Sequence, residues 1–177
     1  MFDQSAYDAN DGRAKEMFSR LFYECEKFVD IYGRHFVLEN PKNKFVEDFF
    51  VLDSDGRHVA NVEVEVKACW RTHDFPFDNV QLLPRKRKFW IDEVNGGKRP
   101  IPTLFVMFNN DLSNHLAIHS DDLYEIYSGG DRVSYASCMT RNDNFYVAGL
   151  DKVVFGYLFN KNKQKTKKVR DENALWT

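Results

Sequence analysis

The chain has 177 residues, of which 43% are hydrophobic and 15% aromatic, and its formal net charge is −2. This length and apolar content suit one folded domain and exclude a disordered chain. The small net charge excludes a global basic field, so a nucleic-acid surface must be a local patch. The three cysteines lack CxxC spacing and the N-terminus has no apolar core. No apolar run approaches about 18 residues, so we expect no membrane segment, reduced thiols and a cytoplasmic location.

The first predicted element is an amphipathic helix over Arg13–Asp30, preceded by a loose lead-in at residues 1–12. Apolar residues recur at helical spacing through it. Glu24 falls at the edge of this apolar stripe, so its carboxylate would lie close to a sheet packed against the helix. Glu16 points to the solvent side. We prefer Glu24 as the functional acid of this helix, with Glu16 as the alternative if the helix starts or turns differently.

A hairpin follows, after a short strand at His35–Leu38. Phe45–Leu52 predicts one strand, Val59–Trp70 predicts its longer partner, and Asp53–Gly56 between them is a strong turn signal. Within the second strand, Val62–Lys67 alternates strictly between valine and charged residues. Two glutamates and a lysine therefore share one face of the strand, and three valines share the other.

The rest of the chain predicts further strands and short helices of an α/β domain. Residues 71–84 are expected to be irregular, and residues 161–177 to form a basic, flexible tail. The remaining predicted elements are a short helix at Arg85–Glu93, strands at Thr103–Phe108 and His115–His119, a helix at Leu123–Tyr127, and short strands at Val133–Met139, Phe145–Val147 and Val153–Phe159.

The acidic strand has a carboxylate partner across the hairpin. Antiparallel pairing can bring Asp48 close to Glu65 on the same face of the sheet. Two close carboxylates repel each other and need a cation, and oxygen ligands suit Mg²⁺, which keeps waters that can attack a phosphate. Lys67, two residues beyond Glu65, would stabilise charge on phosphoryl oxygens or lower the pKa of the attacking water. These ingredients point to phosphodiester hydrolysis.

With a helix acid, a strand aspartate, a hairpin and then Glu65-Val66-Lys67, the chain resembles the PD-(D/E)XK nuclease superfamily. Its order and spacing are also similar to those of archaeal-type Holliday junction resolvases and small phage nucleases. The resemblance implies an α/β fold with a mixed central β-sheet flanked by helices, built on a restriction-endonuclease-like αβββαβ core. It implies catalytic roles for Asp48, Glu65, Lys67 and Glu24. It also implies Mg²⁺, or Mn²⁺ as a substitute, held by Asp48, Glu65 and the Val66 carbonyl.

Two features depart from the superfamily's pattern. Glu47 stands where a proline would precede the aspartate. Glu63 adds a second acid on the active face, so the choice of Glu65 as metal ligand rests on its spacing to Lys67 alone. The resemblance spans residues 13–120, and the rest of the chain is unmatched.

A local basic cluster supplies the predicted nucleic-acid surface. Arg85, Lys86, Arg87 and Lys88 would neutralise backbone phosphates and give a salt-dependent, sequence-independent affinity. The lysine-rich tail would add a second contact. We expect DNA rather than RNA as the substrate, and a homodimer because two strands often must be cut. The small size and aromatic content suit a phage-encoded nuclease acting in the host cytoplasm.

Two other functions remain open. The same fold could bind nucleic acid or a protein partner without turnover. Alternatively, the acidic strand could be a solvated face with cross-strand ion pairs in an unrelated α/β domain. Metal-dependent cleavage of DNA separates the first alternative from a nuclease, and the separation of the Asp48 and Glu65 carboxylates tests the second.

Overall fold

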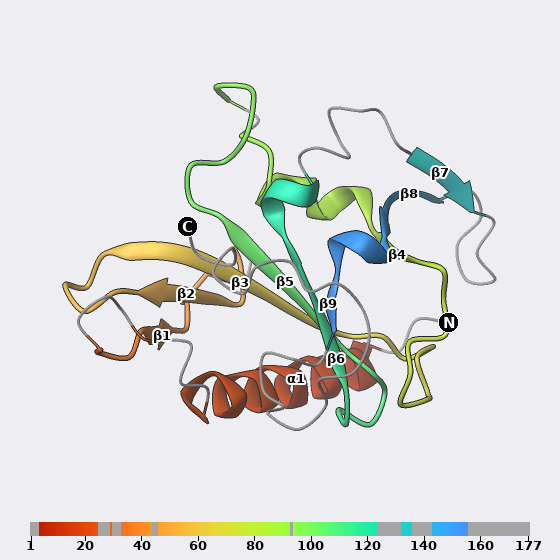
Figure 1. Cartoon of the computed structure of the whole chain (residues 1–177), viewed down its shortest axis with the longest axis horizontal. Coiled ribbons are helices and arrows are strands. Elements are labelled where there is room, and N and C mark those ends of the chain that lie inside the picture. Colours follow the sequence, from red (N-terminus) through yellow and green to blue (C-terminus); the bar gives the residue numbers. More distant parts are fainter. Residues whose placement is uncertain are drawn as a thin grey trace.

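The computed structural model describes residues 4–24, 29, 33–43, 46–92, 94–123, 132–135 and 143–155. Its central feature is a six-stranded sheet in the order β1-β2-β3-β5-β6-β9, and a three-stranded sheet in the order β4-β8-β7 lies beside it (Figure 1). β3 and β5 are parallel, whereas the other neighbouring strands of the large sheet are antiparallel. This arrangement confirms the predicted α/β class with a mixed central sheet.

The strands of the large sheet are β1 (Val37–Glu39), β2 (Phe49–Leu52), β3 (His58–Val66), β5 (Thr103–Phe108), β6 (His115–His119) and β9 (Val154–Phe155). Those of the small sheet are β4 (Asn79–Leu82), β7 (Arg132–Tyr135) and β8 (Asp143–Gly149). The described helices include α1 (Gln4–Glu24) and the short 3₁₀ helices η1 (Pro84–Phe89) and η2 (Leu150–Lys152), and residues 120–123 are also helical.

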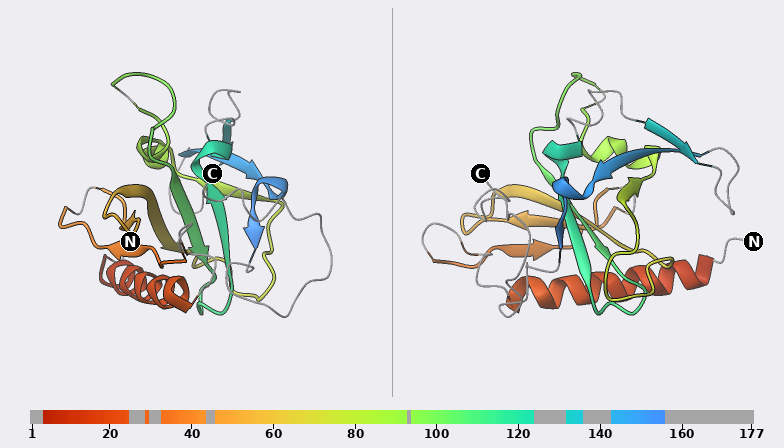
Figure 2. Two further views of the ribbon diagram at one scale, coloured as in Figure 1. Left: turned by 60° about the vertical axis from the view of Figure 1, so that its left-hand side comes forward. Right: turned by 45° about the vertical axis from the view of Figure 1, so that its right-hand side comes forward.

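The large sheet separates two hydrophobic cores. On one face, Val62 and Val64 of β3 pack with Phe18 and Phe22 of α1. The opposite face carries a second core built mainly from aromatic and aliphatic side chains of β5, β6, β4 and η1, with Trp90 fully buried in it. Figure 2 shows α1 along one side of the sheet and η1 on the other. Because strand residues alternate between faces, β3 presents its even-numbered residues to α1 and its odd-numbered residues to η1.

The hairpin between β2 and β3 forms where the sequence predicts it. The Asp53 carboxylate accepts hydrogen bonds from the N–H groups of Asp55 and Arg57, both at 2.9 Å. Gly56 has a φ of 77°, a left-handed conformation that glycine adopts without strain. The turn signal at Asp53–Gly56 is therefore confirmed, and it fixes the register of β2 against β3.

The predicted lead-in over residues 1–12 is wrong from Gln4 onward, because α1 begins there. The prediction relied on apolar spacing, which is weak in this segment. A helix can extend beyond its apolar stripe when its own side chains support it, and Lys15 and Asp11 form such an i,i+4 ion pair at 2.9 Å. The extension matters because it includes Asp11, whose partner Lys15 also contacts Asp48.

Several predicted boundaries also shift. β2 begins at Phe49 rather than Phe45, and β3 ends at Val66 rather than Trp70. Trp70 instead packs in the core, where its indole N–H donates to the Asp74 carbonyl at 2.9 Å. Core packing, not strand pairing, thus explains that aromatic position. The stretch expected to be irregular contains β4, and the expected helix after Pro84 is the shorter η1.

Other predictions lie mainly outside the described residues. These are the end of the first helix beyond Glu24, the part of the helix expected at Leu123–Tyr127 that follows Leu123, and the basic tail at residues 161–177.

Candidate active site at the start of strand β2

Asp48 lies immediately before β2 and is fixed against β3. Phe49 pairs with Val62 in the antiparallel register, so the position of Asp48 falls opposite Glu63. The Asp48 Oδ2 atom accepts a hydrogen bond from the Val64 N–H at 2.7 Å. The Asp48 side chain therefore accepts a hydrogen bond from β3 one residue before the backbone pairing of β2 begins at Phe49.

The other oxygen of Asp48 meets α1. Lys15 Nζ lies 2.7 Å from Asp48 Oδ1 and 2.9 Å from Asp11 Oδ2. Burial by itself would lower the pKa of Lys15, but the hydrogen bonds to Asp48 and Asp11 outweigh it and raise that pKa above its ordinary value. Burial raises the pKa of Asp48, and Lys15 and the Val64 N–H only partly offset this. Helix α1 therefore contributes a paired lysine and aspartate, Lys15 and Asp11, to the surroundings of Asp48.

Glu63 is the most enclosed carboxylate of the β3 series, with its side chain 9% exposed. Its Oε1 atom contacts Lys86 Nζ, which reaches it from η1. Burial raises the pKa of Glu63 to about 7, against the opposing effect of Lys86, and the negative charge of Asp48 raises it further. Asp48 is therefore one of the charges that act on Glu63.

Glu65 is paired with Lys67, at 2.5 Å between Oε1 and Nζ. The Lys67 ammonium also donates to the Gln81 carbonyl of β4 at 3.2 Å. Burial alone would raise the pKa of Glu65, but Lys67 and Lys86 outweigh it and hold that pKa below its ordinary value. Glu65 is therefore an ionised carboxylate with cations on two sides.

The backbone of β3 adds oxygen atoms to this region. The N–H groups of Asn61 and Lys67 donate toward β5, to the carbonyls of Pro102 and Phe108 at 2.8 Å each. The Val64 N–H instead points to Asp48. Because successive residues of a strand turn their backbone groups to opposite edges, the Val66 carbonyl lies on the edge of β3 that Asp48 occupies.

Carboxylate and backbone carbonyl oxygens are the kinds of ligand that Mg²⁺ binds. Among the described residues, no three His, Cys, Asp or Glu side chains form a group that could hold a metal ion. Mg²⁺, however, is commonly bound through one or two carboxylates together with waters and substrate phosphates. Asp48 and Glu63 are largely buried carboxylates of this kind, and a cation could bind at Asp48 only after Lys15 releases it.

Glu24 is not brought to this region. Its side chain is 63% exposed and lies 3.9 Å from Arg20. It sits about two and a half turns of α1 beyond Lys15, so it is far from Asp48 along the helix axis. The prediction used only the angular position of Glu24 around the helix. Glu16, the alternative, is exposed next to Lys15.

The basic segment divides between the interior and the surface. Lys86 turns inward to Glu63, whereas Arg85, Arg87 and Lys88 are exposed. The Lys88 ammonium lies 4.7 Å from the centroid of the Phe89 ring, and the charge of Arg85 acts on Glu65. The predicted phosphate-binding cluster thus lies next to the carboxylates, but its second residue, Lys86, contacts Glu63.

A further ion pair ties the loop before β2 to η1. Buried Glu47 contacts Arg99, which also donates to the Lys88 carbonyl at 3.2 Å. Sequence reasoning missed this pair, and it missed Lys15 and Lys86 as partners of the acids. Only the pairing of Lys15 with Asp11 at i,i+4 had a local signal. The other contacts join segments that are distant in sequence.

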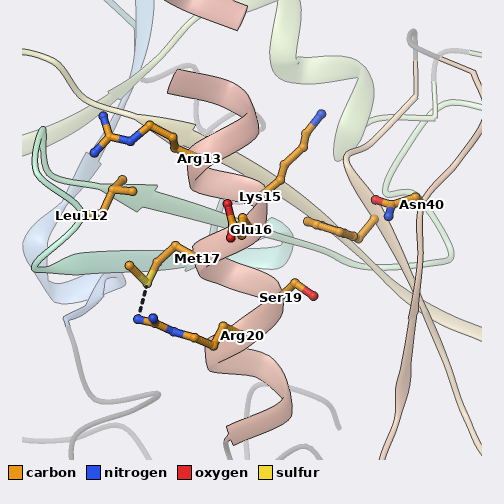
Figure 3. Close-up of a pocket in the computed structure, with 9 residues that line it drawn as sticks. Arg13, Lys15, Glu16, Met17, Ser19, Arg20, Asn40 and Leu112 are labelled. Atoms are coloured by element: carbon orange, nitrogen blue, oxygen red, sulfur yellow. Dashed lines mark hydrogen bonds between the residues drawn. The ribbon is translucent and has the colours of Figure 1, made fainter. Parts of the chain in front are cut away.

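Figure 3 shows a shallow depression of about 700 Å³ over the outer side of α1. Arg13 and Lys15 leave the helix on different sides, and Asn40 and Leu112 also line the depression. Lys15 and Phe49 connect this surface to Asp48, but none of the described carboxylates of β2 and β3 lines it. The depression is therefore a neighbour of the site.

No family model, curated protein or solved structure matches the chain. No helix in the described part of the chain is long and apolar enough to cross a membrane.

Proposed function

We propose that this chain is a metal-dependent endonuclease that hydrolyses phosphodiester bonds in DNA. The observation that carries the proposal is that the Val64 N–H holds Asp48 against β3 at the start of β2, and that Asp48, Glu63 and Glu65 each contact a lysine. Carboxylates that hold a divalent cation, together with ammonium groups that stabilise phosphoryl oxygens, are what phosphodiester hydrolysis needs.

The topology supports the resemblance to the PD-(D/E)XK superfamily. A helix precedes three antiparallel strands, and a connection containing η1 then leads to β5, which is parallel to β3. This order agrees with an αβββαβ core, with a 3₁₀ helix in the connecting segment. The acidic hairpin lies at the centre of the sheet in such a core, as it does here.

The residues have separate tasks in this proposal. Asp48, a glutamate of β3 and the Val66 carbonyl would hold Mg²⁺ or Mn²⁺, which supplies an activated water and polarises the phosphate. Lysine ammonium groups stabilise the charge that develops as the water oxygen bonds to phosphorus and the bond to the leaving sugar oxygen breaks. Lys15 must leave Asp48 before a cation can bind there.

The exposed cations of η1 suit the proposed substrate. Arg85, Arg87 and Lys88 lie on the same element as Lys86, so a phosphate backbone that contacts them would pass beside Glu63 and Glu65. Such contacts confer salt-dependent affinity without sequence preference. We propose DNA before RNA, and a homodimer as the form that cuts both strands.

The test is cleavage of supercoiled plasmid, single-stranded and branched DNA, and RNA by the full chain, with Mg²⁺, with Mn²⁺ or with EDTA. We expect metal-dependent cutting of DNA that Asp48→Asn removes. Asp55→Asn is the matched control, because Asp55 is exposed at the tip of the hairpin and contacts Arg57. The absence of cleavage on every substrate with both metals would refute the nuclease assignment.

A second candidate is a domain that binds nucleic acid without cutting it. The pairing of each site carboxylate with a lysine favours it, since these charges are already balanced within the protein. Retarded migration of DNA with intact product at every metal concentration would support this second candidate.

A further inference from the structure

We propose that Glu63, rather than Glu65, is the functional partner of Asp48, and that Lys86 of η1 is the positioning residue for this pair. The inference rests on the proposed nuclease function and assigns the residues of its centre. It differs from the assignment by sequence spacing, which selects Glu65 because Lys67 follows two residues later.

The register of the hairpin favours Glu63. Phe49 pairs with Val62, and the next step outward sets Asp48 against Glu63. The hydrogen bond from the Val64 N–H to Asp48 Oδ2 holds the aspartate at this level of β3. Glu65 lies one further pair along the strand, beyond the point where the aspartate is anchored.

The charges agree with the register. Asp48 is among the main influences on the pKa of Glu63, after burial and Lys86. The main influences on Glu65 are burial and the cations Lys67, Lys86 and Arg85. The charge of Asp48 is thus among the main influences on Glu63 and not among those on Glu65.

Lys86 is placed on Glu63 by an element that the core anchors. Its side chain is 13% exposed and its ammonium contacts Glu63. η1 is anchored by the buried side chains of Phe89 and Trp90, and the Phe89 carbonyl accepts a hydrogen bond from Thr103 Oγ1 of β5 at 2.9 Å. A lysine held in this way opposes the protonation that burial favours at Glu63 and fixes the position of its carboxylate.

Lys67 has a different orientation. Its ammonium is shared between Glu65 and the Gln81 carbonyl, which belongs to β4. The pair of Glu65 and Lys67 therefore links β3 to the small sheet and lies beside the pair of Asp48 and Glu63. We assign the pair of Glu65 and Lys67 a supporting role next to Asp48 and Glu63.

The experiment compares matched substitutions in the full chain, with Mn²⁺ binding measured by calorimetry in the absence of DNA and cleavage measured separately. We expect Glu63→Gln to weaken Mn²⁺ binding by about tenfold or more and Glu65→Gln by about threefold or less. Lys86→Met should slow cleavage by about 10–100-fold, and Lys86→Arg should restore most of the rate. Lys67→Met should slow cleavage less than Lys86→Met does.

Circular dichroism establishes that each variant is folded. If Lys86→Met alone unfolds the chain, the double variant Glu63→Gln/Lys86→Met removes both charges and carries the comparison of Mn²⁺ binding with Glu65→Gln/Lys67→Met. A larger loss of Mn²⁺ binding in Glu65→Gln than in Glu63→Gln, or normal cleavage by Lys86→Met, overturns the assignment while the nuclease function stands. A wild-type chain that neither binds Mn²⁺ nor cuts DNA overturns both.

Discussion

The two faces of β3 are stabilised in opposite ways. The face toward α1 is apolar and buries Val62 and Val64 among aromatic side chains. The face toward η1 carries Asn61, Glu63 and Glu65, whose polar groups need partners. Buried ion pairs add little net stability compared with apolar packing, because desolvation offsets their attraction. The first face therefore accounts for the fold, and the second carries charges that the fold alone does not require.

The largest effect should come from opening the apolar face. Phe18 is fully buried and its ring centroid lies 5.6 Å from that of Phe49. Phe18→Ala should lower the free energy of unfolding by about 3–5 kcal/mol, through lost burial and the cavity left behind. Urea denaturation provides the measurement, with Val94→Ala, at a 91% exposed position, as the control. A loss of less than about 1 kcal/mol would mean that α1 is not held by this core.

Glu63 on the charged face should make the free energy of unfolding depend on pH. Burial raises the pKa of Glu63 from an ordinary value of 4.5 to about 7, so between these values the native state binds a proton that the unfolded state does not. The stabilisation from this proton is complete below the unfolded pKa and is lost as the pH rises through about 7. It should amount to about 3 kcal/mol.

The measurement is the difference in unfolding free energy between wild type and Glu63→Gln at pH 5 and at pH 8. The wild type should lose stability relative to the variant at the higher pH. His115, whose pKa burial lowers to about 4, has the opposite dependence, but it is present in both proteins and cancels in the difference. Parallel profiles would contradict the burial of an ionisable Glu63.

A smaller effect is expected at the surface beside the charged face. Replacing both Arg85 and Arg87 by serine should weaken DNA binding and reduce the slope of log affinity against log salt by about 1.8, or about 0.9 for each lost phosphate contact. Arg57→Ser, at the tip of the hairpin, is the control. Fluorescence anisotropy at several salt concentrations measures the slope, and an unchanged slope would place the DNA elsewhere.

The smallest effect is expected at the far end of α1. Glu24 is exposed and its contact with Arg20 is long, at 3.9 Å. Glu24→Gln should change the unfolding free energy by less than about 0.5 kcal/mol and leave cleavage unchanged. Should the variant lose tenfold or more in cleavage rate, Glu24 would have to reach the site in a conformation other than this one.

The sequence was sufficient where structure depends on local pattern. Strict alternation and the turn at Asp53–Gly56 specify the β2–β3 hairpin, and the hairpin brings Asp48 to the Val64 N–H of β3. The choice between Glu63 and Glu65 needed the register, which depends on where β2 begins. Sequence spacing to Lys67 could not supply it.

The lysine partners of the acids could not be predicted from the sequence, for a different reason. Lys15 reaches Asp48 because of where α1 crosses the sheet along its axis, and helical periodicity defines only the angle around that axis. Lys86 turns inward because η1 is a 3₁₀ helix anchored by Phe89 and Trp90. Neither contact leaves a signal in a run of basic residues.

The most direct test of the nuclease assignment is the Mg²⁺-dependent cleavage rate of wild type relative to Asp48→Asn, measured at saturating protein on one DNA substrate. Asp48 is the residue that joins α1, β2 and β3 at the site. We predict a loss of about 100-fold or more in Asp48→Asn, with wild-type rates in Asp55→Asn. Equal rates in wild type and Asp48→Asn would contradict the assignment.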